Sequence, residues 1–518
     1  LNASGTIDES VDATTTNITT TGTLSLTGGG SIGTTGGGTE SLDIAAGTLT
    51  ATTSSGGIFL RDPSTLTIGS GNVRTTAGNA PINLEIVAGD LTLDGDITAH
   101  GSGDVDLTLG GAGAAVITSA GTDDIASTSG AITITADTLT LVTGTISSTG
   151  GALILQPNAA SRTIGLGNGA SGNFSLDATE LGLLSNGFSS ITLGRTNAGA
   201  VDINAHTFTD PVTVVGGAMT VDGLQAGAND ITLTSSSTID ESVDATTTNI
   251  TTTGGLTLTS GGAIADNIDV TGHLDIDVGT VNVTATGGTD VSLRDAGTSN
   301  TTYTVATGGA GDVSLNQAAN NLVVDTITTT NGAVTLVGAA NVFELGSDTT
   351  ADITTTGAVS VTAGTSIGAT GAGALDIASS TNLTLDSNDD VAVRGSAQTL
   401  TDLTLTVDGG TDGAVYELTN LANITETITT DNTDLTVTAL DATGDANLSL
   451  TNDTGNVTVT SFDTTLAGTL SVTASSGNII LADGALVTGS GGVSLNASGT
   501  IDESTNATTT NITTTGGL

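Results

Sequence analysis

Pairs of neighbouring carboxylates are the residues of this chain whose types and spacing come closest to a chemical site. Asp8–Glu9, Asp240–Glu241 and Asp502–Glu503 occupy the same place in three copies of one stretch, and Asp390 ends the turn SNDD. Ca²⁺ prefers carboxylate oxygens, so stacked copies could align them into calcium sites. However, the sequence lacks the GGxGxDxUx nonapeptide of calcium-binding β-rolls. We therefore expect weak Ca²⁺ binding as a counter-ion, with no specific metal site.

Two further acid pairs, Asp104 with Asp106 and Asp275 with Asp277, are spaced two residues apart and therefore share one face of a strand. Enzymes that cleave polysaccharides also use parallel β-helices, and they gather several acids in a groove lined by aromatics. Here the acids are spread evenly, and only 2% of residues are aromatic. We expect both pairs on a solvated outer face, with a carbohydrate-active β-helical enzyme as an alternative function.

Other catalytic residue types are sparse in this sequence. The three histidines, His100, His206 and His273, each stand apart from a Ser or Cys signature, and the chain has no Cys. No GxSxG, Walker A or HExxH motif occurs, and the Gly-rich run at 110–115 lacks a following Lys for phosphate. We expect the histidines to be structural or at the surface, and we predict no catalytic or cofactor-binding residue.

Three of the six arginines occupy matching places, in FLRD at Arg61, SLRD at Arg294 and AVRG at Arg394. We predict that each lies where a strand ends and pairs with acids on an adjacent coil. The alternative is that sequence duplication copied them without consequence, since surface ion pairs are often worth under about 1 kcal/mol.

The elements that must position these residues are strands. Runs such as TLSLT (23–27), AITIT (131–135) and NVTVT (456–460) alternate Val, Ile or Leu with Thr or Ser, and Gly, Asn and Asp separate the runs. Only 177–187 favours a short helical turn. Strand clusters recur about every 20 residues, the length of one solenoid coil, and stacking the coils would bury their apolar faces. We predict an all-β fold, a long parallel β-solenoid of roughly 25 coils, about 120 Å long at about 4.8 Å per coil. An array of sandwich domains is the alternative fold.

The sequence also repeats over a period much longer than one coil. The stretch TIDESVDATTTNITTTG begins at Thr6 and again at Thr238, and TIDESTNATTTNITTTG begins at Thr500. A partial copy at 353–380 resembles 18–47. We predict one continuous solenoid over 1–518, with long repeats at 6–237 and 238–499 and a third beginning at 500–518. Neither end resembles a polar cap, so we expect the chain to be a window of a longer protein.

Composition bounds the partners. There are 53 acids against six bases, for a net charge of −47. This charge excludes nucleic acid as a binding partner and opposes binding to anionic membranes. No apolar run approaches the roughly 20 residues of a membrane span, so we predict no membrane insertion. We expect self-stacking coils, with filament formation by one chain or many left open. Thr ladders could order ice, but Thr shares its positions irregularly with Asp, Ser and Asn, so ice binding is a further alternative.

The segment 161–217, with ITLGR and FTDPVTV, resembles the coils of filamentous haemagglutinin-like, β-strand-repeat exoproteins of bacteria. The resemblance implies a right-handed parallel β-helix, secretion to the bacterial cell surface, and a structural fibre or stalk serving adhesion or surface scaffolding. It also implies that contacts with other cells or surfaces are made by regions outside this chain.

Overall fold

The computed structural model describes residues 1–10, 14–34, 41–118, 121, 123–242, 247–265, 272–369, 371–378, 380–396, 402–407, 414–422, 425–430, 434–443, 447–464, 469–488, 491–505 and 510–518. The chain is all-β, with parallel strands stacked as a β-solenoid of about 18 turns and about 23 residues per turn. The predicted fold class is confirmed. The turns are longer and fewer than expected, because loops between strands add residues that the strand spacing did not count.

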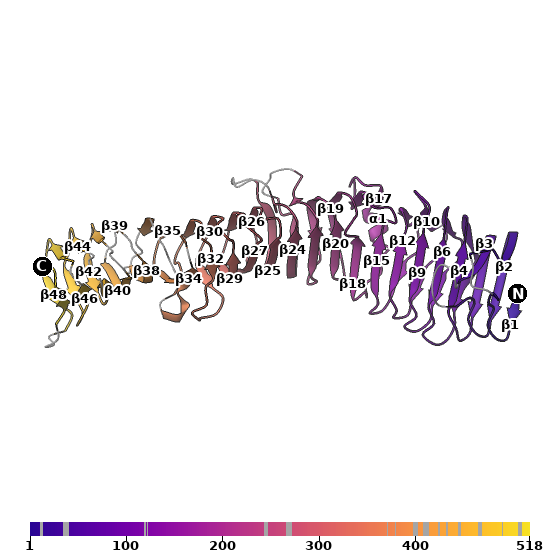
Figure 1. The fold of residues 1–518 in the computed structure, drawn as a ribbon, viewed down its shortest axis with the longest axis horizontal. Helices are drawn as coiled ribbons and strands as arrows, with labels where there is room; N and C mark the ends of the chain where they lie inside the picture. The colour runs from indigo at the N-terminus through magenta and orange to yellow at the C-terminus, as the bar shows by residue number, and fades with distance from the viewer. Residues whose placement is uncertain are drawn as a thin grey trace. The chain divides into compact units, whose positions relative to one another are not determined.

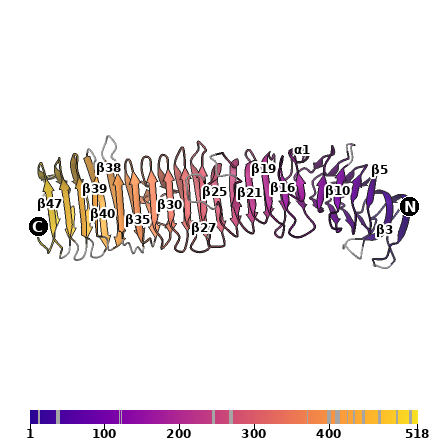
Figure 2. The ribbon, with the colours of Figure 1, turned by 90° about the horizontal axis from the view of Figure 1, so that it is seen from above.

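The chain divides into two compact units, residues 1–243 with 249–259 and residues 244–248 with 260–518. Figure 1 shows successive turns within each unit as rungs, and Figure 2 shows the arrows of consecutive turns running in one direction. That one solenoid runs unbroken through 1–518 stays a prediction.

The first unit carries the strands and the α-helix from β1 to β24. They are β1 (Asn2–Ala3), β2 (Ile18–Gly28), β3 (Leu42–Thr53), β4 (Ile58–Asp62), β5 (Leu66–Thr75), β6 (Ile82–Ile86), β7 (Leu91–Leu93), β8 (Ile97–Ala99), β9 (Val105–Leu109), β10 (Ala115–Thr118), β11 (Ile125–Ser127), β12 (Ile132–Thr135), β13 (Thr138–Thr140), β14 (Ile146–Ser147), β15 (Ala152–Gln156), β16 (Ile164–Leu166), β17 (Phe174–Leu176), α1 (Ala178–Leu181), β18 (Ser190–Gly194), β19 (Val201–Thr207), β20 (Val212–Gly216), β21 (Met219–Gln225), β22 (Ile231–Ser235), β23 (Ile239–Asp240) and β24 (Ile250–Ser260).

The second unit carries the elements from β25 onward, including one 3₁₀ turn. They are β25 (Leu274–Ala285), β26 (Val291–Asp295), β27 (Thr301–Thr307), β28 (Val313–Gln317), β29 (Leu322–Thr328), β30 (Val334–Gly338), β31 (Val342–Glu344), β32 (Ile353–Thr354), β33 (Val359–Ala363), η1 (Gly371–Gly373), β34 (Leu375–Ala378), β35 (Asn382–Ser387), β36 (Val391–Ser396), β37 (Asp402–Val407), β38 (Ala414–Ala422), β39 (Thr425–Thr430), β40 (Asp434–Thr443), β41 (Asn447–Asn452), β42 (Asn456–Val459), β43 (Phe462–Thr464), β44 (Leu470–Ala474), β45 (Ile479–Leu481), β46 (Leu486–Thr488), β47 (Val493–Ala497), β48 (Ile501–Glu503) and β49 (Ile512–Thr513).

The core of each unit is a set of branched apolar ladders. Alternation along each strand turns every second side chain inward, and parallel register then places like residues above one another. One ladder of the first unit, in which each residue is the register partner of the next, consists of Ile58, Ile82, Val105, Ile132, Leu153, Ile191, Val212 and Ile231. A corresponding ladder of the second unit consists of Ile264, Val291, Val313, Val334, Val359 and Leu383. All these side chains are buried, and each contributes about 1.5–3 kcal/mol by leaving water.

Many acids and amides of the turns join one coil to the next. The side-chain oxygen of an Asp or Asn before a strand accepts the backbone N–H of the equivalent residue one coil later. Asp290 accepts from Asp312 at 2.9 Å, and Asp312 accepts from Ala333 at 2.7 Å. In the first unit the same series of hydrogen bonds links Asn72, Asp96, Asp124 and Thr145, each side-chain oxygen accepting the backbone N–H of the next residue in the series. These acids therefore satisfy backbone donors that would otherwise lie unpaired at the bend of each coil.

Glycines occupy bends where neighbouring coils approach most closely. A Cβ built on Gly332 would lie 2.0 Å from the carbonyl oxygen of Gly311. Thr329 completes the bend, since its hydroxyl donates to Gly311 O at 2.9 Å and accepts from Gly332 N–H at 3.1 Å. Only a residue without a side chain fits this separation.

The predicted helical turn within 177–187 is present as α1. Asp177 caps its N-terminus by accepting from the N–H groups of Thr179 and Glu180, and the Glu180 side chain returns a bond to the Asp177 N–H. This capping box stabilises a helix too short to form by itself.

Candidate functional site

The three matching arginines form ion pairs with buried aspartates of the preceding coil. Each Arg is the direct register partner of its Asp, on strands β4 with β3, β26 with β25, and β36 with β34. The closest nitrogen–oxygen distances are 2.9 Å for Arg61–Asp43, 2.7 Å for Arg294–Asp275 and 3.1 Å for Arg394–Asp376. The prediction that these arginines pair with acids on adjacent coils is confirmed.

These pairs are more buried than a surface ion pair. The side chain of Asp275 is 2% exposed and that of Arg294 is 22% exposed. Burial raises the pKa of Asp275, and Arg294 and His273 oppose that rise. The expectation that Asp275 lies on a solvated face with Asp277 is therefore wrong for Asp275, because the Arg294 side chain of the following coil lies over it. Asp277, two residues along the strand, is exposed as expected.

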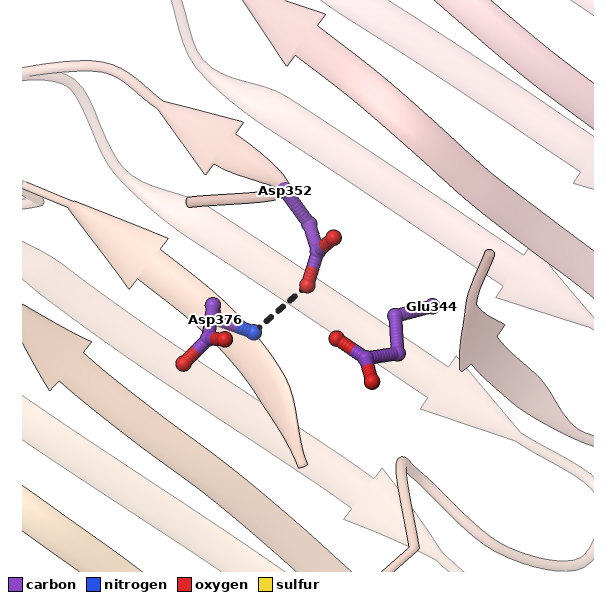
Figure 3. Close-up of side chains that lie close together, drawn as sticks. All are labelled: Glu344, Asp352 and Asp376. Carbon is purple, nitrogen blue, oxygen red and sulfur yellow. Dashed lines mark hydrogen bonds between the residues drawn. The ribbon is translucent and has the colours of Figure 1, made fainter. Parts of the chain in front are cut away.

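The third pair belongs to a larger group of acids. Glu344 ends β31, Asp352 directly precedes β32, and Asp376 lies in β34. All three are buried, and one oxygen of each lies within 4.8 Å of the others. Asp352 Oδ2 accepts the Asp376 backbone N–H at 2.7 Å, and the Glu344 carboxylate points toward the space between the two aspartates (Figure 3). We refer to Glu344, Asp352 and Asp376 as the carboxylate cluster.

Strand pairing explains why the carboxylate cluster forms. Both β31 and β32 pair with the single strand β29, through Leu322↔Val342 and Ile327↔Ile353. The intervening residues 345–351 leave the sheet as a loop, so Glu344 and Asp352 flank its two ends. The strand β34 then pairs with β32, Ile377 opposite Ile353, and this register sets Asp376 beside Asp352.

Burial, reinforced by the crowding of like charges, raises the pKa values of these three acids. Burial, together with the nearby Glu344, Asp376 and Asp348 carboxylates, raises the pKa of Asp352 to about 8, and one backbone hydrogen bond opposes the shift. The pKa of Asp376 rises to about 6, chiefly through burial, although Arg394 opposes the shift. Burial also raises the pKa of Glu344. Without a counter-ion, Asp352 therefore holds its proton at neutral pH.

The same framework recurs elsewhere in the sequence with one change. A Glu stands eight residues before an Asx-Ile-Thr-Thr-Thr-Gly motif, at Glu9, Glu241, Glu344 and Glu503. The Asx residue is Asn17, Asn249 and Asn511 in three copies and Asp352 in the fourth. In the first unit, Asn17 Oδ1 accepts the Asp43 N–H at 3.0 Å, just as Asp352 accepts from Asp376. Asp352 thus replaces a neutral amide by a third carboxylate.

The acids that the sequence offers as calcium candidates lie outside the carboxylate cluster. The aspartates of the Asp-Glu pairs, Asp8, Asp240 and Asp502, each accept the backbone N–H of the next residue at 2.9–3.0 Å. The Asp390 carbonyl accepts from the Ile367 N–H. Among the described residues, none of these acids belongs to a group of three that could hold a metal ion. The signal that could have found the cluster is the eight-residue spacing from Glu344 to Asp352, followed by the Asp of the LDIA strand.

The remaining candidate residues make the following local contacts. Asp104 accepts from the Ala131 N–H at 2.8 Å, and burial together with Asp104 raises the pKa of Asp106. His100 Nδ1 lies 2.9 Å from Gly78 O. His206 packs edge-on against Phe208 at 4.7 Å between ring centroids, and burial lowers its pKa.

His273 is buried and bonds through Nδ1 to the Ser292 hydroxyl on the next coil. The equivalent positions hold Ser41 with Phe59 in one copy and Ala374 with Ala392 in another. Such varied pairs fit a packed interior better than a shared chemical role.

One open hollow of about 490 Å³ lies near β16, β19 and β21. Its lining includes Asp202, whose Oδ2 accepts from the N–H and hydroxyl of Ser171 at 2.6 and 3.0 Å. A glycosidase needs two carboxylates across one groove, and this lining holds a single acid.

Comparisons with known proteins give no match: no family model, no curated protein and no solved structure is similar to this chain. Within the described residues, no helix has the length and apolarity needed to cross a membrane.

Proposed function

We propose that this chain is a structural part of an extracellular fibre or stalk on a bacterial surface, serving adhesion or surface scaffolding. The observation that supports the proposal most strongly is the use made of polar side chains. The turn acids accept backbone donors of the next coil, and Arg61, Arg294 and Arg394 bridge to acids of the preceding coil. Residue types that perform chemistry in enzymes here hold consecutive turns together.

Charge and repetition support the same role. A net charge of −47 keeps neighbouring molecules apart and soluble, while it disfavours nucleic acid and anionic lipid as partners. A solenoid turn contacts only its neighbours, so such a chain lengthens by duplication without new packing solutions. The resemblance of residues 161–217 to filamentous haemagglutinin-like exoproteins supports the bacterial surface as the location.

Immunogold labelling of intact producing cells with antibodies against residues 1–518 tests the location and the role together. We expect label on unpermeabilised cells or on material that extends from them. Label that appears only after permeabilisation would overturn the surface assignment. Cleavage of a polysaccharide panel by the purified chain would instead support the carbohydrate-active enzyme.

A further inference from the structure

We propose that the carboxylate cluster of Glu344, Asp352 and Asp376 binds one hard divalent cation, with calcium as the expected ion. The bound ion would fasten both ends of the loop 345–351 to strand β34 of the following turn. This inference concerns a site in the fold and does not depend on the cellular role proposed above.

The spacing of the oxygens matches one bound ion. Ca²⁺ binds oxygen at about 2.3–2.6 Å, so two oxygens on opposite sides of the ion lie about 4.8 Å apart. One oxygen each from Glu344, Asp352 and Asp376 lies within 4.8 Å of the other two. The three oxygens can therefore contact one ion with small side-chain movements, and the exposed loop 345–350 leaves room for water as further ligands.

A second observation points to a missing ligand. Glu344 is 7% exposed, and its Oε1 is buried without a hydrogen-bond partner. This carboxylate points toward Asp352 and Asp376 (Figure 3). A buried carboxylate oxygen without a donor is costly, and a cation placed between the three acids removes that cost.

Charge balance also favours a divalent ion. The three acids carry −3 when ionised, and Arg394 supplies +1 through its 3.1 Å contact with Asp376 Oδ2. One divalent cation, with a charge of +2, would neutralise the remaining −2. Asp348 is the other nearby charged group, exposed on the loop, and its carbonyl accepts from Arg394 Nη1 at 3.0 Å. An all-oxygen site without His or Cys suits calcium better than zinc.

The chain itself provides the matched variant. Asn17 occupies the position equivalent to Asp352 and makes the same bond to the backbone N–H of the next coil. Asp352→Asn should therefore keep the fold while it removes one of the three carboxylates. Asp94→Asn, on an exposed turn acid, removes the same charge elsewhere and serves as the control.

Isothermal titration of the full chain with CaCl₂ in 150 mM NaCl tests the proposal, because salt suppresses diffuse counter-ion binding to this acidic protein. We expect one saturable site in the wild type and in Asp94→Asn, and affinity at least tenfold weaker in Asp352→Asn. Hydrogen exchange should show calcium-dependent protection at β32 and β34 in the first two proteins only. Equal binding by Asp352→Asn and wild type, or no saturable site in the wild type, would overturn the site. Tighter saturation by MgCl₂ than by CaCl₂ would overturn the assignment to calcium.

Discussion

Removal of Arg294 is the most informative perturbation of the cross-coil ion pairs. Asp275 is 2% exposed and lies 2.7 Å from Arg294 Nη1, so Arg294→Gln leaves a buried carboxylate without its counter-charge. Breaking such a pair from one side typically costs about 3–5 kcal/mol. Asp275 can limit that cost by taking up a proton.

The free-energy cost of protonating Asp275 depends on pH. An unfolded Asp has a pKa of about 3.9, and each pH unit above it costs about 1.4 kcal/mol to keep the group protonated. Protonated Asp275 therefore costs about 4 kcal/mol at pH 7 and about 1.5 kcal/mol at pH 5. We expect Arg294→Gln to destabilise strands β25 and β26 by about 3–4 kcal/mol at pH 7 and by no more than about 1.5 kcal/mol at pH 5. Asp275→Asn combined with Arg294→Gln should lose less at pH 7 than Arg294→Gln alone.

Hydrogen–deuterium exchange resolved to β25 and β26 measures this local opening free energy, and it avoids the assumption that a long solenoid unfolds in one step. Arg74→Gln is the control, because Arg74 is exposed and no ion pair involving it is found among the described residues. If Arg294→Gln lowers the opening free energy by less than about 0.5 kcal/mol at both pH values, as the control Arg74→Gln should, the reasoning is refuted. Duplication without consequence would then explain the matching arginines.

Three further predictions follow from the cluster and the bends. In EDTA, the free energy of unfolding should fall as pH rises from 5 to 8. Burial raises the pKa of Asp352 from 3.8 to about 8, so the folded state binds this proton more tightly than the unfolded state does. The stabilisation from this proton is lost as pH rises toward the folded-state pKa. Thermal melts should show a smaller fall for Asp352→Asn, and an equal fall would contradict this cause. Asn17→Asp should raise calcium stoichiometry from one to two in titration; a stoichiometry of one would show that a third carboxylate is insufficient. Gly332→Ala should destabilise its bend by about 1–3 kcal/mol, since the new Cβ would meet Gly311 O at 2.0 Å; exchange no faster than in Gly279→Ala, whose Cβ meets nothing within 4 Å, would argue against that contact.

The fold was predictable because its signal is local. Alternation of Val, Ile and Leu with Thr along runs such as 131–135 indicates a one-sided strand, and register then stacks Ile132 between Val105 and Leu153. The pairing of Arg294 was predictable for the same reason, since duplication preserved its place at a strand end. The length of a turn was not, because loops such as 345–351 leave the ladder without a periodic mark.

The carboxylate cluster was missed because its members are close only after the chain has completed a turn. Asp376 lies 24 residues after Asp352, and the register of β34 on β32 brings them together. Burial could not be read from spacing either, since Asp275 and Asp277 look equivalent in the sequence and differ once Arg294 covers one of them. The partners of acids and arginines on neighbouring coils can be predicted only when the number of residues in each coil is known.

Electron microscopy of the native material from cells or culture medium, with diffraction for the axial repeat, tests the central claim most directly. The account predicts thin, unbranched fibres with a repeat near 4.8 Å along the axis, the spacing of hydrogen-bonded strands in consecutive turns. Compact particles, or beads at domain-sized spacing without that axial repeat, would contradict it.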